Sequence, residues 1–136
     1  MARYWLMKSE PDVYGWDDLV RDGEGTWDGV RNYRARNNLA AMAVGDEAFF
    51  YHSNIGKEVV GVVTISAPAM PDPTAPGEKW VAVKVKPRRK LGEPVSLATI
   101  KAEPRLAECE IVRQSRLSVC ELTREEFGVI LELASQ

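Results

Sequence analysis

Six consecutive residues near the start of the chain carry the groups that recognise a flat, polar ring. They are Trp27, Asp28, Gly29, Val30, Arg31 and Asn32. The indole offers a stacking surface, and the polar groups lie beside a predicted helix start at residue 33, where backbone N–H groups are unpaired. A nucleobase fits such a site. The alternative is structural: Trp27 fills the core, and Asp28 or Asn32 caps the helix.

Further polar groups follow predicted strands or turns, so they could converge on one rim of a small curled sheet. They are Lys8, Ser9, His52, Ser53, Asn54, Gln114, Ser115 and Arg116. Tyr51 or Trp80 could add an aromatic wall. Stacking contributes roughly 1–3 kcal/mol to binding whatever the base. Hydrogen bonds to the base edge distinguish one base from another, because a buried polar group without a partner costs about 1–3 kcal/mol. In the structural alternative, Lys8 extends along a strand end, His52 is a satisfied core histidine and Asn54 is a turn residue.

The spacings of common catalytic and metal motifs are missing from the sequence. It contains no glycine-rich phosphate loop, no histidine pair and no cysteine cluster. His52 and Ser53 are adjacent in a predicted strand, so their side chains point to opposite faces and cannot act as a pair. We therefore expect a protein that is not an enzyme and has neither a metal site nor a cofactor.

Composition indicates an ordinary globular chain. Its 136 residues suit a single domain, 1–136, and 45% hydrophobic with 28% charged residues is typical of such domains. No apolar run is long enough to cross a bilayer, and the start lacks a signal-peptide pattern, so we expect no membrane association. Cys109 and Cys120 are the only cysteines. A reduced, cytoplasmic protein with inert thiols is expected.

The net charge of −2 does not favour nucleic-acid binding by the molecule as a whole. Basic residues are nevertheless clustered. Arg31, Arg34 and Arg36 form one group, and the segment 84–90 holds another. Either group could contact phosphates or be solvated surface, and we assign Arg31 and Arg34 to phosphate contact.

Hydrophobic patterns predict an α+β fold, with a mixed sheet of about five or six strands curled around a core and helices at its margins. Strands are expected at 3–8, 47–53, 58–66, 80–86 and 117–122. Helices are expected at 14–20, 33–42 and 104–109, with a helical turn in a loop at 94–100. The proline-rich segment 68–76 is predicted to lack regular structure. Thr123 and Glu126 match a capping box that begins a C-terminal helix.

Four blocks, in order, resemble the EVE domain family. They are residues 4–11, 27–33, 49–54 and 115–119, and the segment 122–127 continues the match. The resemblance implies a PUA-like fold, a curled β-barrel flanked by helices and similar to YTH domains, which hold methylated adenine in an aromatic cage. It also implies a non-catalytic reader that takes a modified base, above all modified cytosine, of DNA or RNA into an aromatic pocket.

The resemblance assigns roles to individual residues. Trp27 is the implied stacking wall. Lys8, Ser9, Asp28 and Asn32 are implied to contact the base edge, with His52 and Ser53 near the pocket, and Arg116 is implied to hold a phosphate. We add Tyr51 and Trp80 as further walls of the base site.

The implied partner is nucleic acid whose modified base is single-stranded or flipped out of a duplex, at a cost of a few kcal/mol. We expect a monomer and a separate effector protein that supplies further affinity. The alternative is a small hydrolase or nuclease acting on modified nucleosides or RNA, as in the related ASCH domains, with Lys8 or His52 as acid or base.

Overall fold

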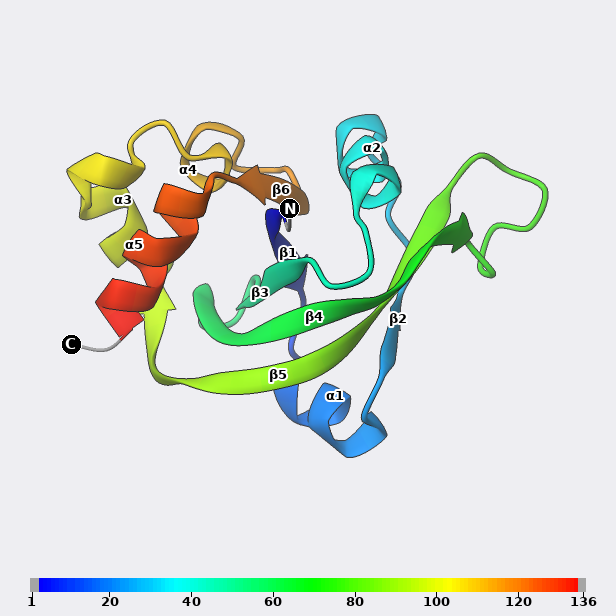
Figure 1. Cartoon of the computed structure of the whole chain (residues 1–136), viewed down its shortest axis with the longest axis horizontal. Coiled ribbons are helices and arrows are strands. Elements are labelled where there is room, and N and C mark those ends of the chain that lie inside the picture. The colour runs from blue at the N-terminus through cyan, green and yellow to red at the C-terminus, as the bar shows by residue number, and fades with distance from the viewer. Residues whose placement is uncertain (1–2, 135–136) are drawn as a thin grey trace.

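The structure of the protein is a computed structural model that describes residues 3–134, and one mixed six-stranded sheet dominates it (Figure 1). The strands are β1 (Tyr4–Ser9), β2 (Gly25–Trp27), β3 (Glu47–His52), β4 (Glu58–Pro71), β5 (Val81–Ser96) and β6 (Val119–Leu122). Their order is β2-β5-β4-β3-β1-β6, and only β1 and β3 pair in parallel. The sheet curls without closing, because β2 and β6 are its two edges. The architecture expected from the sequence is confirmed.

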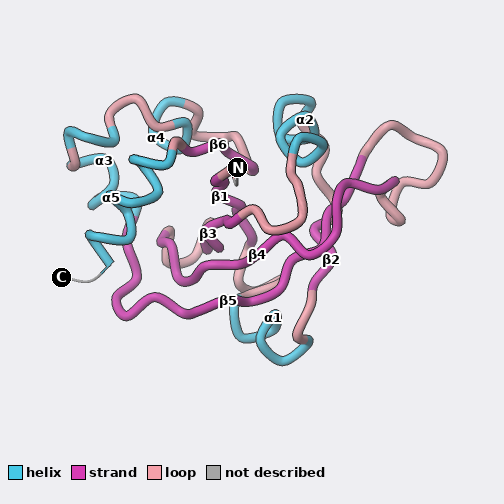
Figure 2. Tube along the Cα trace, viewed as in Figure 1, coloured by secondary structure: helices cyan, strands magenta, loops and turns pink. Residues whose placement is uncertain are grey.

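Helices lie at the margins of this sheet, as Figure 2 shows. They are α1 (Trp16–Asp22), α2 (Tyr33–Ala41), α3 (Leu97–Ala102), the 3₁₀ turn η1 (Pro104–Leu106), α4 (Glu110–Arg113) and α5 (Arg124–Ala134). In Figure 1, α3, α4 and α5 gather at one end of the sheet, α2 stands beside β4, and α1 lies on the opposite side. The carboxyl ends of β1 and β2 therefore lie near loops and are not covered by helices.

The central position predicted for the valine-rich strand is confirmed. β4 pairs with β3 on one side and β5 on the other, and its residues Val59, Val62, Val63 and Ile65 are fully buried. A strand covered on both faces needs apolar residues on both, which explains the continuous run. The predicted turn joining it to β3 is also present, with Asn54 in the left-handed region at φ 65°.

The prediction that residues 68–76 lack regular structure is wrong for 68–71. Pro68 lies inside β4, where its pairing with β5 shifts register between Ala67 and Met70, and Pro71 is the last residue of β4, paired with Val81. A proline has no N–H to donate, so it is tolerated where the ladder is already interrupted. The same reasoning corrects the loop expected from residue 94, since β5 continues through Pro94 to Ser96.

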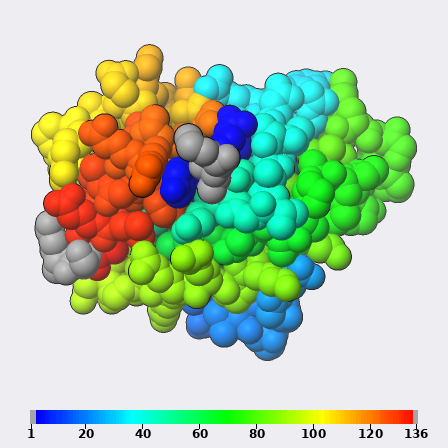
Figure 3. All heavy atoms as spheres, in the orientation of Figure 1, coloured from blue at the N-terminus to red at the C-terminus, as the bar shows by residue number. Residues whose placement is uncertain are grey.

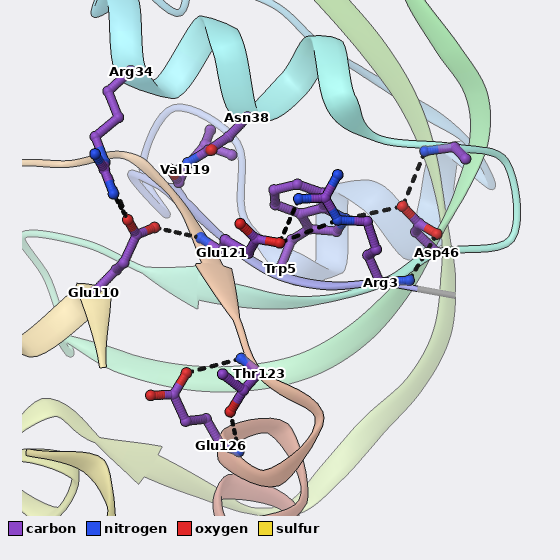
Figure 4. A network of polar contacts seen from close by, with 11 residues as sticks. Arg3, Trp5, Arg34, Asn38, Asp46, Glu110, Val119, Glu121, Thr123 and Glu126 are labelled. Atoms are coloured by element: carbon purple, nitrogen blue, oxygen red, sulfur yellow. Dashed lines mark hydrogen bonds and ion pairs between the residues drawn. The ribbon is translucent and has the colours of Figure 1, made fainter. Parts of the chain in front are cut away.

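Two short elements, β2 and α4, were not predicted from the sequence, whereas the capping box before α5 was. β2 has three residues and α4 four, too few for a hydrophobic period to be recognised. The capping box is confirmed: the Thr123 N–H donates to Glu126 Oε1 at 2.9 Å, and the Glu126 N–H donates to Thr123 Oγ1 at 3.1 Å (Figure 4).

Trp5, predicted as a core residue, is fully buried in β1. Its Nε1–H donates to Oδ2 of the buried Asp46 at 3.1 Å, and the same carboxylate accepts the backbone N–H groups of Arg3 and Ala43 at 3.0 Å each (Figure 4). The polar end of the indole is thus satisfied inside the core, as a buried Trp requires.

Candidate functional site

A cavity of about 560 Å³ lies where the carboxyl ends of β1 and β2 meet the segment before α1. We call it the Trp27 cavity. Its lining residues are Lys8, Ser9, Glu10, Val13, Tyr14, Thr26, Trp27, Asp28 and Gly29. Four residues that the sequence assigned to base binding, from two separate blocks, are therefore together in one site. This size is within the usual range for a small-molecule pocket.

Trp27 is both a core residue and a wall of this cavity. Its backbone pairs with Val83 of β5, and its ring packs edge-to-face on Phe50, with centroids 5.3 Å apart and planes at 85°. The side chain is 8% exposed. The two alternatives considered for this indole are thus compatible: Phe50 fixes the ring from the core, and a narrow part of it borders the open cavity.

Asp28 is exposed on the rim and makes no side-chain hydrogen bond or ion pair with the described residues 3–134. Gly29 follows with φ +78°, a conformation that favours glycine, and its N–H donates to Asp72 Oδ2 at 2.9 Å. The rim is therefore held by its backbone, and the Asp28 carboxylate stays available to a ligand.

The residue that holds this rim, Asp72, was missed in the sequence. It is fully buried, and besides the Gly29 N–H it accepts the Thr74 N–H at 2.7 Å, the Thr74 hydroxyl at 2.6 Å and Arg31 Nη1 at 3.0 Å. Burial alone would raise the pKa of Asp72, but these donors lower it to about 2. The local signal was Asp72 two residues before Thr74, typical of an Asx turn, which says nothing about the distant Gly29.

Lys8 stands between the Trp27 cavity and a second one. Its Nζ donates to the Ser115 carbonyl at 3.1 Å and lies 5.7 Å from the centre of the Tyr51 ring. Burial lowers the pKa of Lys8, because removing water disfavours the charged form. The Ser9 hydroxyl donates to the Tyr14 carbonyl at 2.6 Å, so it faces the Trp27 cavity mainly as an acceptor.

The second cavity, of about 530 Å³, is strongly basic, and we call it the Arg116 cavity. Its lining includes Lys8, Glu10, Tyr51, Ser53, Lys57, Lys101 and Arg116. Four cations thus face one carboxylate. Arg116 makes no hydrogen bond or ion pair with the part of the chain that the structure describes, and the buried Tyr51 turns its ring side to the same space. An anion such as a phosphate would be favoured there.

Asn32, expected at the base edge, and His52, expected near the pocket, both have structural partners. Asn32 caps α2, its Oδ1 accepting the Ala35 N–H at 3.0 Å, so the capping alternative is confirmed for this side chain. His52 lines a different cavity, and its Nε2 accepts the Trp16 N–H at 3.1 Å at the start of α1. Burial lowers the pKa of His52, with Glu58 and Asp17 acting in the opposite direction.

Three more residues lie outside both cavities. The Arg31 guanidinium is committed to Asp72 and to Thr74 Oγ1, and Arg34 forms an ion pair with Glu110 (Figure 4). Trp80 packs against Tyr33 in the loop before β5, with ring centroids 5.2 Å apart. Of the three arginines assigned to phosphate, Arg116 is the one that the structure leaves unpaired within residues 3–134.

Neither a metal nor a reactive thiol is indicated in residues 3–134. That range contains no cluster of three or more His, Cys, Asp or Glu side chains placed to hold an ion, and no helix with the length and apolar character to span a membrane. Cys109 and Cys120 are free and buried, and burial raises the pKa of their thiols to about 11 and about 12. Such thiols are poor nucleophiles at neutral pH.

The sequence and the fold both match known proteins. The family model described as "EVE domain" matches residues 3–133. Mouse thymocyte nuclear protein 1 is 46% identical over an alignment of 86 positions, which covers 54% of this chain and 38% of that protein. This chain therefore spans well under half the length of that relative.

Solved structures agree over nearly the whole chain. Atu2648 from Agrobacterium tumefaciens is 44% identical with a TM-score of 0.95, covering 98% of this chain and 93% of its own. Human THYN1, solved in complex with 5-methylcytosine-containing DNA, is 34% identical with a TM-score of 0.90 and 99% coverage of both chains.

A more distant likeness concerns the fold alone. ASCH from Zymomonas mobilis is 13% identical with a TM-score of 0.56, covering 96% of this chain and 95% of its own. The family match extends over almost every described residue and includes the blocks that build both cavities. The chain belongs to the EVE domain family.

Proposed function

We propose that this protein is a non-catalytic reader that takes a modified base, methylated cytosine or a close relative, of DNA or RNA into the Trp27 cavity. The observation that carries the proposal is the cavity itself, which joins an indole, the unpaired Asp28 carboxylate and the Lys8 ammonium around a space of about 560 Å³. The human relative solved with 5-methylcytosine-containing DNA supports the choice of base.

The groups around the cavity complement the edge of a cytosine. Its exocyclic amino group is a donor that a carboxylate accepts, which suits Asp28. Its ring nitrogen and carbonyl are acceptors, which suit the Lys8 ammonium. Val13 and Trp27 offer apolar surface to a methyl substituent. A base can reach this site only when it is unpaired, so the reader takes single strands or flips the base out of a duplex.

Binding of the neighbouring backbone is assigned to the Arg116 cavity. It shares Lys8 and Glu10 with the Trp27 cavity, so a base in one places its own or the next phosphate close to the other. Arg116, Lys57 and Lys101 supply the positive charge. Because the chain as a whole carries −2, these local cations must offset its general repulsion of nucleic acid. We propose that the protein acts as a monomer and that an effector protein adds further affinity.

Titration of short single-stranded oligonucleotides, identical except for one cytosine or 5-methylcytosine, tests the proposal. The parent should bind the methylated oligonucleotide more tightly, and Asp28→Ala should weaken that binding by about 1–3 kcal/mol. Asp12→Ala is the matched control, because Asp12 is equally an exposed acid and does not line the cavity. Equal binding of both oligonucleotides by the parent, or equal affinities of the two variants, would contradict the assignment.

One observation favours a second candidate, an ASCH-like hydrolase or nuclease acting on modified nucleosides or RNA. Lys8 lies at the shared wall of the two cavities and its pKa is lowered, which brings a lysine closer to use as a base. Incubation with modified nucleosides and RNA, followed by mass spectrometry, separates the two functions. A product that the parent forms and Lys8→Met does not would support the enzyme.

A further inference from the structure

A pair of aromatic residues, one exposed and one half-buried, lies outside both cavities. It consists of Tyr33, the first residue of α2, and Trp80, the last residue before β5. The ring centroids are 5.2 Å apart with planes at 34°. Tyr33 is 54% exposed, whereas an aromatic ring is normally placed to bury its surface. Figure 3 shows the residues of α2 and of the loop before β5 meeting on the surface of the molecule.

Three cations surround this pair. The Arg31 guanidinium lies 5.7 Å from the Trp80 ring centre, and Lys79 Nζ and the Arg36 guanidinium lie 4.8 Å and 5.5 Å from that of Tyr33. Arg36 hydrogen-bonds the neutral Asn37, so its charge is not compensated by that contact, whereas Arg31 is paired with Asp72. The exposed Glu78 is the acid next along the chain. The surface therefore combines flat rings with an excess of positive charge.

A structural role explains only half of this cluster. Trp80 covers the Arg31 guanidinium, which in turn binds Asp72 and stabilises the rim of the Trp27 cavity. Tyr33 has no comparable structural role, because its side chain makes no hydrogen bond to the backbone of residues 3–134 and contacts the Trp80 ring and two solvent-facing cations. These contacts leave more than half of the Tyr33 side chain open to solvent.

We propose that Tyr33 and Trp80 form a stacking platform for an unpaired base of single-stranded nucleic acid, with Lys79 and Arg36 contacting the adjoining phosphates. Aromatic rings interleaved with cations are the arrangement by which proteins hold single strands without regard to sequence. The charges exclude a cationic ligand, such as a methylated lysine, because three cations already occupy the approaches to the rings.

The platform lies close in sequence to the reader site but is distinct from it. Gly29 lines the Trp27 cavity, and Tyr33 follows four residues later, so their Cα atoms are separated by at most roughly 14 Å. A strand whose modified base enters the cavity can thus extend over the platform. The inference shares with the proposed function only the class of partner, and it does not require the bound base to be modified.

The test uses the full chain and a short, unmodified oligothymidylate, which offers the Trp27 cavity no cytosine. Tyr33→Ala should weaken its binding by about 5- to 150-fold, the range expected for loss of one stacked base. Tyr33→Phe keeps the ring and should retain the parent affinity. Val44→Ala is the control for loss of exposed apolar surface, because Val44 is 61% exposed and has no ring on which a base could stack. Thermal unfolding of all three variants should match the parent.

A second probe separates stacking from charge. An abasic strand of the same length keeps every phosphate, so the parent and Tyr33→Ala should bind it equally. Lys79→Gln should make the logarithm of the affinity for the oligothymidylate less dependent on the logarithm of salt, by about 0.7. Equal affinity of the parent and Tyr33→Ala for oligothymidylate, absence of parent binding, or an equal loss on the abasic strand overturns the platform.

These outcomes are independent of those for the reader site. If Tyr33→Ala weakens oligothymidylate binding while methylated cytosine gives no advantage, the platform stands and the proposed function fails. If methylated cytosine is preferred and Tyr33→Ala binds oligothymidylate like the parent, the proposed function stands and the platform is overturned.

Discussion

The backbone N–H of Gly29 donates to the buried carboxylate of Asp72 at 2.9 Å, across 43 positions of sequence. That hydrogen bond attaches the rim of the Trp27 cavity to the loop between β4 and β5. The same carboxylate holds Arg31, whose guanidinium lies over Trp80. A single buried acid therefore fixes both the rim of the Trp27 cavity and one half of the aromatic pair, although it is not itself a lining residue of the Trp27 cavity or the Arg116 cavity.

Replacing Asp72 with Asn should lower stability, because an amide NH₂ would face donors that the carboxylate now satisfies. Folding lowers the pKa of Asp72 from 3.8 to about 2. This shift corresponds to a contribution of about 2.5 kcal/mol to the free energy of unfolding at neutral pH. Since the folded pKa is the lower one, the unfolded chain takes up the proton first. This stability is present above about pH 4 and is lost as pH falls toward 2.

Urea denaturation at pH 7 and at pH 3 measures this contribution. The parent should lose more stability between the two pH values than Asp72→Asn does. Asp12→Asn, at an exposed acid that lines neither the Trp27 cavity nor the Arg116 cavity, should behave as the parent does. A pH dependence in Asp72→Asn equal to that of the parent would show that this carboxylate is not the source.

Arg116→Gln should change the salt dependence of nucleic-acid binding, and Arg34→Gln should not. Arg116 lines a basic cavity and is unpaired within the described chain, whereas Arg34 is neutralised by Glu110. Loss of one phosphate contact to a single strand reduces the slope of log affinity against log salt by about 0.7. Titrations at several salt concentrations measure the slope, and equal slopes for the two variants would contradict the assignment of Arg116.

The sequence predicted what depends on local period and on strand ends. The apolar run of β4 identified a central strand, and polar residues at the carboxyl ends of β1 and β2 do line one cavity. The sequence could not predict which charged residues form ion pairs when they lie far apart along the chain. Arg31 and Asp72 are 41 positions apart. The cluster of basic residues in the sequence therefore suggested that Arg31 and Arg34 contact phosphates. In the structure, each of them forms an ion pair with an acidic residue of the same chain.

Residues with two plausible roles were also beyond sequence reasoning. Asn32 and His52 stood in blocks associated with the base site, yet each accepts a backbone N–H at a helix start. Capping a helix and binding a ligand both require a hydrogen-bond acceptor at a turn of the chain. Only the coordinates show whether that acceptor meets an unpaired backbone N–H of the protein or is left for a ligand. The prolines led to a wrong prediction for residues 68–71 for a related reason. Pro68 can lie in a strand because the pairing of β4 with β5 is irregular there, and this pairing involves residues distant in the sequence.

His52 should make stability pH-dependent near neutrality. Its Nε2 accepts the Trp16 N–H, so only the neutral ring can make this bond, and burial lowers the pKa of His52 below its ordinary 6.5. Because the folded pKa is depressed, the contribution is present above pH 6.5 and is lost as pH falls through the folded value. The loss should be about 0.5–1.5 kcal/mol, the net value of one hydrogen bond.

No other histidine can contribute to this titration, because His52 is the only one in the sequence. Thermal unfolding at about pH 7.5 and pH 5 should show the loss in the parent, and His52→Gln, which keeps an acceptor that does not titrate, should show less of it. An NMR titration of the ring gives the pKa directly. A value above 6.5 in the folded protein would contradict this account.

Gly61→Ala should disturb the Trp27 cavity from the opposite side of the core. A Cβ at Gly61 would lie 2.4 Å from Cζ3 of Trp16, whose ring is buried and meets Phe50 edge-on at 5.7 Å. Phe50 also supports Trp27, so displacing Trp16 shifts the packing behind the cavity wall. Overpacking of this kind costs about 1–3 kcal/mol.

Gly128→Ala is the matched control for that variant. Gly128 lies in α5, and a Cβ added there meets no atom within 4 Å, so the change should stabilise the helix by about 0.5–1 kcal/mol. Urea denaturation should therefore move the two variants in opposite directions, and binding of methylated oligonucleotide should weaken in Gly61→Ala alone. Because Trp16 and Trp27 both pack on the one phenyl ring of Phe50, a Gly61→Ala protein that is destabilised yet binds like the parent would show that Phe50 does not transmit the shift.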